Sequence, residues 1–271
     1  MPYLADISYS REATIAAVRG FYQFLSKFYL PESSIIEPPE GGWPQITQES
    51  IGYLEKTDEV IELLRHLPYI RDDDETLTPQ AAPGTRLVDW SRFATRGLDR
   101  DSALLATDGD EWEHVPPHVV GLALEARWSF SFNLDTKLGV IYWIKCPSEV
   151  QNAPSVEPVL DDAADYAPEE ELVWRADGPG WAVADFFEQL QREFRELNFV
   201  PTTQRTVIDD YSTHSGEAGD GSSGALREVY RSHGWPDLDK YQKEDCLEAV
   251  RNMLGERYPD LLEEDEDEDY D

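Results

Sequence analysis

The sequence predicts an α+β fold in which a central antiparallel sheet is covered by helices. Three observations carry this prediction: an amphipathic run after Ser10, a second one over Val183–Leu197, and a hairpin pattern between them over Val119–Ile144. Aromatic residues make up 11% of the 271 residues, which is too many for a chain that is disordered throughout. The chain is therefore expected to bury a substantial core.

The first helix is expected to begin after Ser10, a residue type that often caps helix N-termini. Ile15, Val18 and Tyr22 recur at steps of three and four residues, which places them on one helix face. Pro31 ends the pattern. Thr47 and Thr57 are predicted to cap two shorter helices, whereas residues 92–117 are predicted to be largely loop from their composition.

The strongest β signal is the hairpin. Asp135–Gly139 supplies turn residues, and Val140–Ile144 follows as an apolar, β-branched strand. In the first strand of the hairpin, apolar and polar residues alternate, which is typical of a strand with one buried face. The apolar side chains are therefore expected to share that face. Apolar residues occupy every second position of that strand, at Trp128, Phe130, Phe132 and Leu134.

Residues 147–171 are rich in acids and prolines and are predicted to form a mobile insertion. Leu172–Trp174 is assigned to one more strand, and Asp177–Gly180 to a turn. The amphipathic helix over Val183–Leu197 follows, and Thr206–Ile208 is assigned to a further short strand.

The main α+β domain is predicted to span residues 1–211. Residues 212–224 contain four glycines and four serines, the composition of a flexible linker. A helical pair over residues 225–258 is expected to dock on the main domain across this loose tether, with Gly255 following the end of its second helix. The acidic tail, residues 259–271, is expected to be disordered.

The chain carries a formal net charge of −33, and eight of its acids lie in the last nine residues. The rest of the chain is still strongly acidic. Such a field repels phosphate groups, so neither nucleic acid nor an anionic membrane is an expected partner. No apolar run reaches the roughly 20 residues of a membrane span, and the first residues do not resemble a secretory signal. Cys146 and Cys246 are expected to be free thiols in a reducing compartment, the cytoplasm or alternatively the nucleus.

No catalytic or metal-binding pattern stands out. Two prolines separate His114 from His118, so one helix cannot present both to a metal ion. Ser222 and Ser223 lie in a glycine-rich run and not in the strand–turn–helix context of a nucleophilic serine. We therefore predict no cofactor and no metal, and we favour a protein that is not an enzyme.

Trp43 and Trp235 are the candidate partner-binding residues, because each lies in a turn beside a proline. A tryptophan that is presented by a turn can anchor a protein interface. The alternative is that each indole fills a gap where a loop crosses the core.

Three stretches resemble, in order, the SUKH superfamily of cell-wall-synthesis-regulator-like and toxin-immunity-like proteins. They are Trp43–Pro68 with its Leu-Pro end, the hairpin Val119–Ile144, and the helix Trp181–Leu197 with its start Asp185-Phe186-Phe187-Glu188. The glycine that follows Leu-Pro in that family is missing here. The resemblance implies an α+β fold that binds other proteins and catalyses nothing. Trp235-Pro236-Asp237 with Lys243–Leu247 also resembles a group of uncharacterised fungal proteins.

These observations favour a non-catalytic, acidic interaction protein that binds a basic protein partner. One alternative is an enzyme with carboxylates in an aromatic-lined pocket. A further alternative is a nucleic-acid mimic that occupies the basic cleft of a nuclease-type partner.

Overall fold

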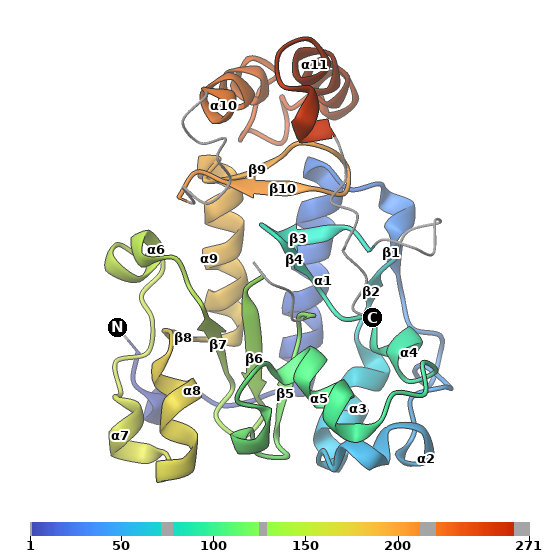
Figure 1. The fold of residues 1–271 in the computed structure, drawn as a ribbon, viewed down its shortest axis with the longest axis vertical. Coiled ribbons are helices and arrows are strands. Elements are labelled where there is room, and N and C mark those ends of the chain that lie inside the picture. The colour runs from blue at the N-terminus through green and yellow to red at the C-terminus, as the bar shows by residue number, and fades with distance from the viewer. Residues whose placement is uncertain (1, 72–77, 125–128, 212–220, 263–271) are drawn as a thin grey trace.

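Short helices and strands make up much of the protein, and the computed structural model describes residues 2–71, 78–124, 129–211 and 221–262 (Figure 1). The α-helices are α1 (Arg11–Phe28), α2 (Gln48–Ile51), α3 (Asp58–His66), α4 (Trp90–Phe93), α5 (Arg100–Asp108), α6 (Ser148–Asn152), α7 (Ala163–Tyr166), α8 (Leu172–Ala176), α9 (Val183–Glu196), α10 (Ser222–Ser232) and α11 (Lys243–Arg257). The strands are β1 (Ile35–Ile36), β2 (Tyr69–Ile70), β3 (Gln80–Ala82), β4 (Thr85–Arg86), β5 (Val119–Gly121), β6 (Ser131–Asp135), β7 (Val140–Ile144), β8 (Gly180–Ala182), β9 (Phe199–Pro201) and β10 (Val207–Asp209). The 3₁₀ turns are η1 (Leu4–Asp6), η2 (Glu32–Ser34), η3 (Gly52–Leu54), η4 (Trp112–His114), η5 (Glu169–Glu171) and η6 (Pro259–Leu262). Within these ranges, no helix is both long enough and apolar enough to cross a lipid bilayer.

The central sheet has the strand order β5-β6-β7-β8, and neighbouring strands are antiparallel. The hairpin that the alternating pattern predicts is confirmed as β6 and β7, with Phe132 opposite Trp143 and Asp135 opposite Val140. With its helical cover, this sheet makes the fold α+β, as predicted. Trp128, which was expected to begin the first strand of the hairpin, lies outside the described residues.

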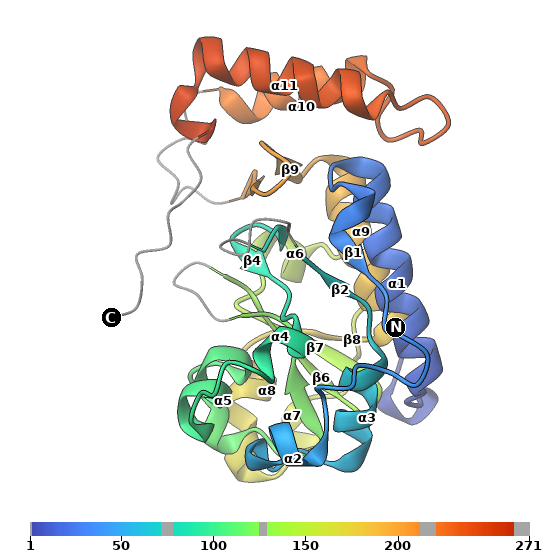
Figure 2. The same ribbon diagram turned by 90° about the vertical axis from the view of Figure 1, so that its right-hand side faces the viewer.

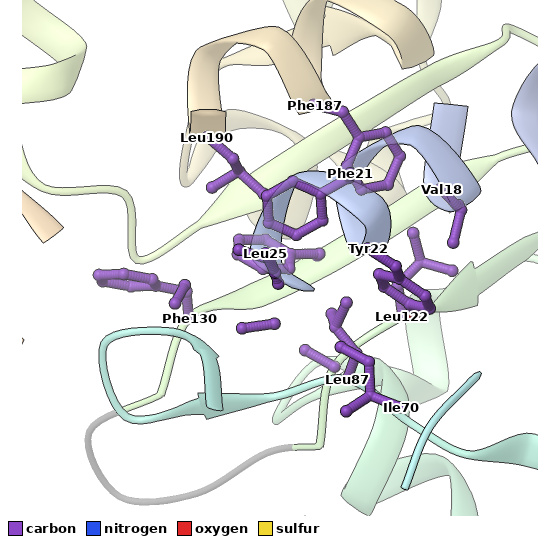
Figure 3. Packing of buried hydrophobic residues seen from close by; sticks show 14 of the residues in the cluster. Val18, Phe21, Tyr22, Leu25, Ile70, Leu87, Leu122, Phe130, Phe187 and Leu190 are labelled. Carbon is purple, nitrogen blue, oxygen red and sulfur yellow. The ribbon is translucent and has the colours of Figure 1, made fainter. Parts of the chain in front are cut away.

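Helices α1 and α9 lie side by side along one face of the sheet (Figures 1 and 3). Phe21 of α1 faces Phe187 and Leu190 of α9, and the ring centres of Phe21 and Phe187 are 5.4 Å apart. Ser10 caps α1 as predicted, because its hydroxyl accepts a hydrogen bond from the N–H of Ala13. The two long periodic patterns thus form the main hydrophobic layer over the sheet.

The opposite face of the sheet is buried as well, so the prediction of a half-buried strand was wrong. Asn133 and Asp135 are polar residues of β6 on this second face, and both are 0% exposed. Helix α8 covers this face over β7, and helix α5 covers it over β5 and β6, where the alternating pattern had suggested solvent. The hydrophobic cluster between α8 and the sheet consists of Val119, Val140, Tyr142, Ile144 and Trp174.

Three segments that were predicted to be non-helical contain helices. Residues 92–117 contain α5, which Asp99 caps by accepting from the N–H of Ser102. Residues 147–171 contain α6 and α7 and pair with the sheet edge, where the N–H of Val159 donates to Gly180. Residues 172–174, assigned to a strand, belong to α8. Each of these helices has nine residues or fewer, too few for a helical period to stand out.

Helices α10 and α11 lie across one end of the molecule, over β9 and β10 (Figures 1 and 2). The indole of Trp235 stacks on Phe28 of α1 with ring centres 3.7 Å apart. The hydroxyl of Tyr241 donates to the carbonyl of Phe28, and that of Tyr230 donates to the carbonyl of Pro201. The C-terminal pair therefore shares its core with the rest of the protein.

The boundaries of this pair differ from those predicted. Helix α10 begins at Ser222, inside the segment 212–224 that composition assigned to a linker. Gly255 lies within α11, because burial of Leu254 beside it outweighs the helical cost of a glycine, about 1 kcal/mol. Residues 259–262, the start of the tail that was expected to be disordered, form η6, and Leu261 is buried there. Residues 212–220 and 263–271 lie outside the described residues.

Candidate functional site

A cavity of about 230 Å³ lies near α7 and α8, at the end of the molecule opposite α10 and α11 (Figure 1). Its walls come from β7, from residues 159–166 and from residues 175–180. Among the lining residues are Tyr142, Asp161, Asp162, Tyr166, Arg175 and Gly178.

Arg175 of α8 forms the inner wall of the cavity, and its side chain is 3% exposed. Its Nη2 donates to Oδ2 of Asp135 at 2.8 Å, and its Nε donates to Oε2 of Glu171 at 2.7 Å. Asp135 ends β6, whereas Glu171 precedes Arg175 by one turn of helix. One guanidinium therefore connects the central sheet to the helix that covers it.

The charges of this cluster reinforce one another. Burial favours the neutral form of Asp135, but hydrogen bonds that include those from His118 and Arg175 outweigh burial and hold its pKa below the ordinary value. Burial also opposes the charge of Arg175, yet Asp135 and Glu171 raise the pKa of the guanidinium. Asp135 is consequently ionised at neutral pH and acts as an acceptor, not as a proton shuttle.

The remaining nitrogen of the guanidinium, Nη1, is buried and has no hydrogen-bond partner among the described residues. Aromatic rings lie beside the guanidinium: Cζ of Arg175 lies 4.3 Å from the ring centre of Trp174 and 5.1 Å from that of Tyr142. The hydroxyls of Tyr142 and Tyr166 are 2.7 Å apart. Because burial raises the pKa of both phenols, they stay neutral at physiological pH.

Glycine is required where the cavity wall meets β7. A Cβ atom on Gly178 would lie 1.9 Å from the carbonyl oxygen of Trp143, far inside van der Waals contact. This close approach lets the N–H of Trp143 donate to the carbonyl of Pro179 at 3.0 Å. The turn predicted over residues 177–180 thus becomes a rigid wall of the cavity.

Two carboxylates of a strongly acidic segment line the cavity. Residues 157–171, which we call the acidic segment, contain seven Asp and Glu and no Lys, Arg or His. Asp161 and Asp162 line the cavity itself. Oδ2 of Asp161 accepts from the N–H of Leu4 at 2.8 Å, and Oδ1 of Asp162 accepts from the N–H of Ala164 at 2.9 Å. These backbone contacts hold both carboxylates in place.

A second buried ion pair belongs to the fold. Nζ of Lys56 donates to Asp108 and, at 2.8 Å, to the carbonyl of Val119. The other carboxylate oxygen of Asp108 accepts from the N–H of Gly121. The two charges neutralise each other, and the pair joins α5 to β5.

The predicted partner-binding residues, Trp43 and Trp235, both lie in the core, where they are 7% and 3% exposed. The indole N–H of Trp43 donates to the carbonyl of Leu67, and that of Trp235 donates to the carbonyl of Phe194. Neither residue lines the cavity. Each indole fills the space beneath a loop, which is the alternative role considered from the sequence.

The cavity offers hydrogen bonds and aromatic faces and no activated nucleophile among the described residues. Cys146 and Cys246 are buried free thiols. Burial raises the pKa of Cys146, and it raises that of Cys246 to about 11, so both are protonated and unreactive at neutral pH. In the described part of the chain, no three His, Cys, Asp or Glu side chains gather as a metal site requires.

Arg175 was not predicted from the sequence to be a site residue, although two features of the sequence point to it. It is the first Lys, Arg or His after Lys145, at the end of a long acidic stretch. Glu171 also precedes it by four residues, the spacing of an ion pair on one helix face. No sequence pattern signals its pairing with Asp135, which lies 40 residues away.

Comparison with protein-family models, curated proteins and solved structures finds no match to this chain. The resemblance to the SUKH superfamily therefore stays a prediction. The function is argued below from the site alone.

Proposed function

We propose that the protein is a non-catalytic binding protein that docks a basic protein partner on its acidic segment, beside the Arg175 cavity. One observation carries this proposal: carboxylates of this segment line a cavity together with a buried guanidinium that has an unused donor. The acidic segment supplies charge complementarity to a cation, and the cavity supplies a specific polar contact.

The exposure of the segment supports this role. Its exposed acids include Glu157, Asp165, Glu169 and Glu170. Each exposed ion pair with a partner contributes less than about 1 kcal/mol. Several together raise the rate of encounter more than the affinity, so short-range contacts in the cavity are needed to retain the partner.

The test uses a peptide of alternating alanine and lysine, amidated and labelled at its carboxyl end, with fluorescence anisotropy as the readout. We expect saturable binding at low salt and none for the matching alanine–glutamate peptide. The double variant Glu169→Gln/Glu170→Gln should weaken binding severalfold. The control Glu248→Gln/Glu256→Gln changes the net charge equally on α11, at the far end of the molecule, and should bind almost as the unaltered protein does.

Equal weakening in the two double variants would mean that the peptide responds to overall charge alone. The acidic segment would then not be the docking site, and the proposal would be wrong.

A further inference from the structure

We infer that the Arg175 cavity receives the amino terminus of a polypeptide, with its α-ammonium group beside Asp161 and Asp162 and its first carbonyl oxygen accepting from Nη1 of Arg175. This inference rests on the proposed binding of a basic partner, and it names the part of that partner that enters the site. Capture of a terminal amine is a known mode of peptide recognition.

The first step is the demand for an acceptor. Arg175 lines the cavity, and its Nη1 is buried and has no hydrogen-bond partner among the described residues. A buried N–H group without an acceptor is unfavourable, so a ligand that brings an oxygen atom to this position gains from it.

The second step concerns the charge of that acceptor. Arg175 already faces two carboxylates, Asp135 and Glu171, and two more line the cavity. A ligand carboxylate would add a further negative charge where solvent screening is poor. A neutral carbonyl oxygen satisfies the donor without that cost.

The third step is the cation. Asp161 and Asp162 each use one carboxylate oxygen on a backbone N–H, and both face a cavity whose other walls include Tyr142 and Tyr166. Carboxylates favour an ammonium group, to which they offer charge-assisted hydrogen bonds.

The fourth step is size. About 230 Å³ is less than the roughly 300–1,000 Å³ of a typical small-molecule pocket. The occupant must therefore carry its ammonium and its carbonyl close together. A lysine ammonium stands at the end of a four-carbon stem, so its carbonyl would remain outside. The first residue of a polypeptide carries both groups on one α-carbon.

The test compares the alanine–lysine peptide having a free amino terminus with an N-acetylated form that carries one extra lysine, so that net charge is equal. We expect the acetylated peptide to bind about tenfold more weakly. Replacing the carboxyl-terminal amide by a free acid should bring no gain.

Two pairs of matched variants locate the effect. Asp162 and Asp99 both cap helices, and Asn caps as well as Asp does. Asp162→Asn should shrink the preference for the free terminus, whereas Asp99→Asn should keep it. Ala176→Phe narrows the cavity and should abolish the preference. Val173→Phe, at an exposed position on the same helix outside the cavity lining, should leave the preference for the free amino terminus unchanged.

Equal binding of the free and acetylated peptides would overturn the inference and leave the proposed function standing. Tighter binding of the free-acid peptide would also overturn it, because the cavity would then prefer a carboxylate. If neither peptide binds, both the inference and the proposed function are wrong.

Discussion

Arg175 is the residue on which both the fold and the candidate site depend, through its guanidinium group. It neutralises Asp135 beneath the sheet and Glu171, the residue before its own helix. It also lines the cavity, and its Nη1 has no hydrogen-bond partner among the described residues. Buried ion pairs of this kind add little to stability compared with apolar packing, yet the loss of one partner leaves an uncompensated charge. Arg175 is therefore more costly to remove than its hydrogen bonds alone suggest.

We predict that Arg175→Met lowers the free energy of unfolding by about 3–5 kcal/mol at pH 7. Arg192→Met removes an exposed pair with Glu188 and should cost less than about 1 kcal/mol. Because the pKa of Asp135 is lowered in the fold, its contribution is present above the unfolded value of about 3.9 and is lost as the pH falls through the folded value. Urea titrations should therefore show the cost of Arg175→Met shrinking below about pH 4. A cost independent of pH would contradict this account of the cluster.

Phe132 tests the core face of the hairpin. Its side chain is 1% exposed, and its ring centre lies 5.0 Å from that of Phe186. Phe132→Ala should cost about 3–5 kcal/mol in the free energy of unfolding. Val173→Ala, at a 61% exposed position, should change stability by less than about 0.5 kcal/mol. Similar, small losses in both variants would show that β6 does not face the core.

At the scale of elements, length decided what the sequence could predict. Helices α1 and α9 have 18 and 14 residues, so their apolar positions repeat often enough to identify them. The hairpin was predictable because its alternation runs into a recognisable turn. Leu172–Trp174 is a short apolar run that suits a strand and a helix equally, and only the Glu171–Arg175 pair favours the helix.

The acidic segment shows the limit of composition. Acids and prolines predicted an insertion without fixed structure, yet the N–H of Val159 pairs with β8 and Asp162 caps α7. Each of these contacts is made with a backbone group, and amino-acid composition does not predict such contacts. The candidate site was therefore missed as a whole, because its walls come from a segment predicted to be mobile.

The C-terminal pair gives a prediction about cooperativity. Trp235 contacts Phe28 and Phe24 of α1, and Nζ of Lys243 donates to the carbonyls of Ser26 and Leu30. Because the pair shares its core with α1, we expect Trp235→Ala to destabilise the whole protein by about 3–5 kcal/mol in one calorimetric transition. Two separate transitions would indicate an independent C-terminal unit.

At the scale of the molecule, the net charge could be predicted from the sequence, whereas the position of the carboxylates around a cavity could not. A formal charge of −33 follows from the sequence. The gathering of carboxylates beside Arg175 depends in part on the contact between α8 and β6, where Arg175 pairs with Asp135, 40 residues away in the chain. The two ends of the molecule also differ: α10 and α11 lie at one end, whereas α7 and α8, which line the cavity, lie near the other (Figure 1).

The central claim is that this charge serves to capture a basic partner at the acidic segment, and the association rate of the alanine–lysine peptide tests it most directly. Stopped-flow rates would be measured from about 0.05 to 0.5 M salt, across which the screening length falls to a few ångströms. We predict that the association rate falls steeply with salt, and that Glu169→Gln/Glu170→Gln lowers both the rate at low salt and the slope more than Glu248→Gln/Glu256→Gln does. An association rate that does not change with salt, or that changes equally in both variants, would contradict the claim.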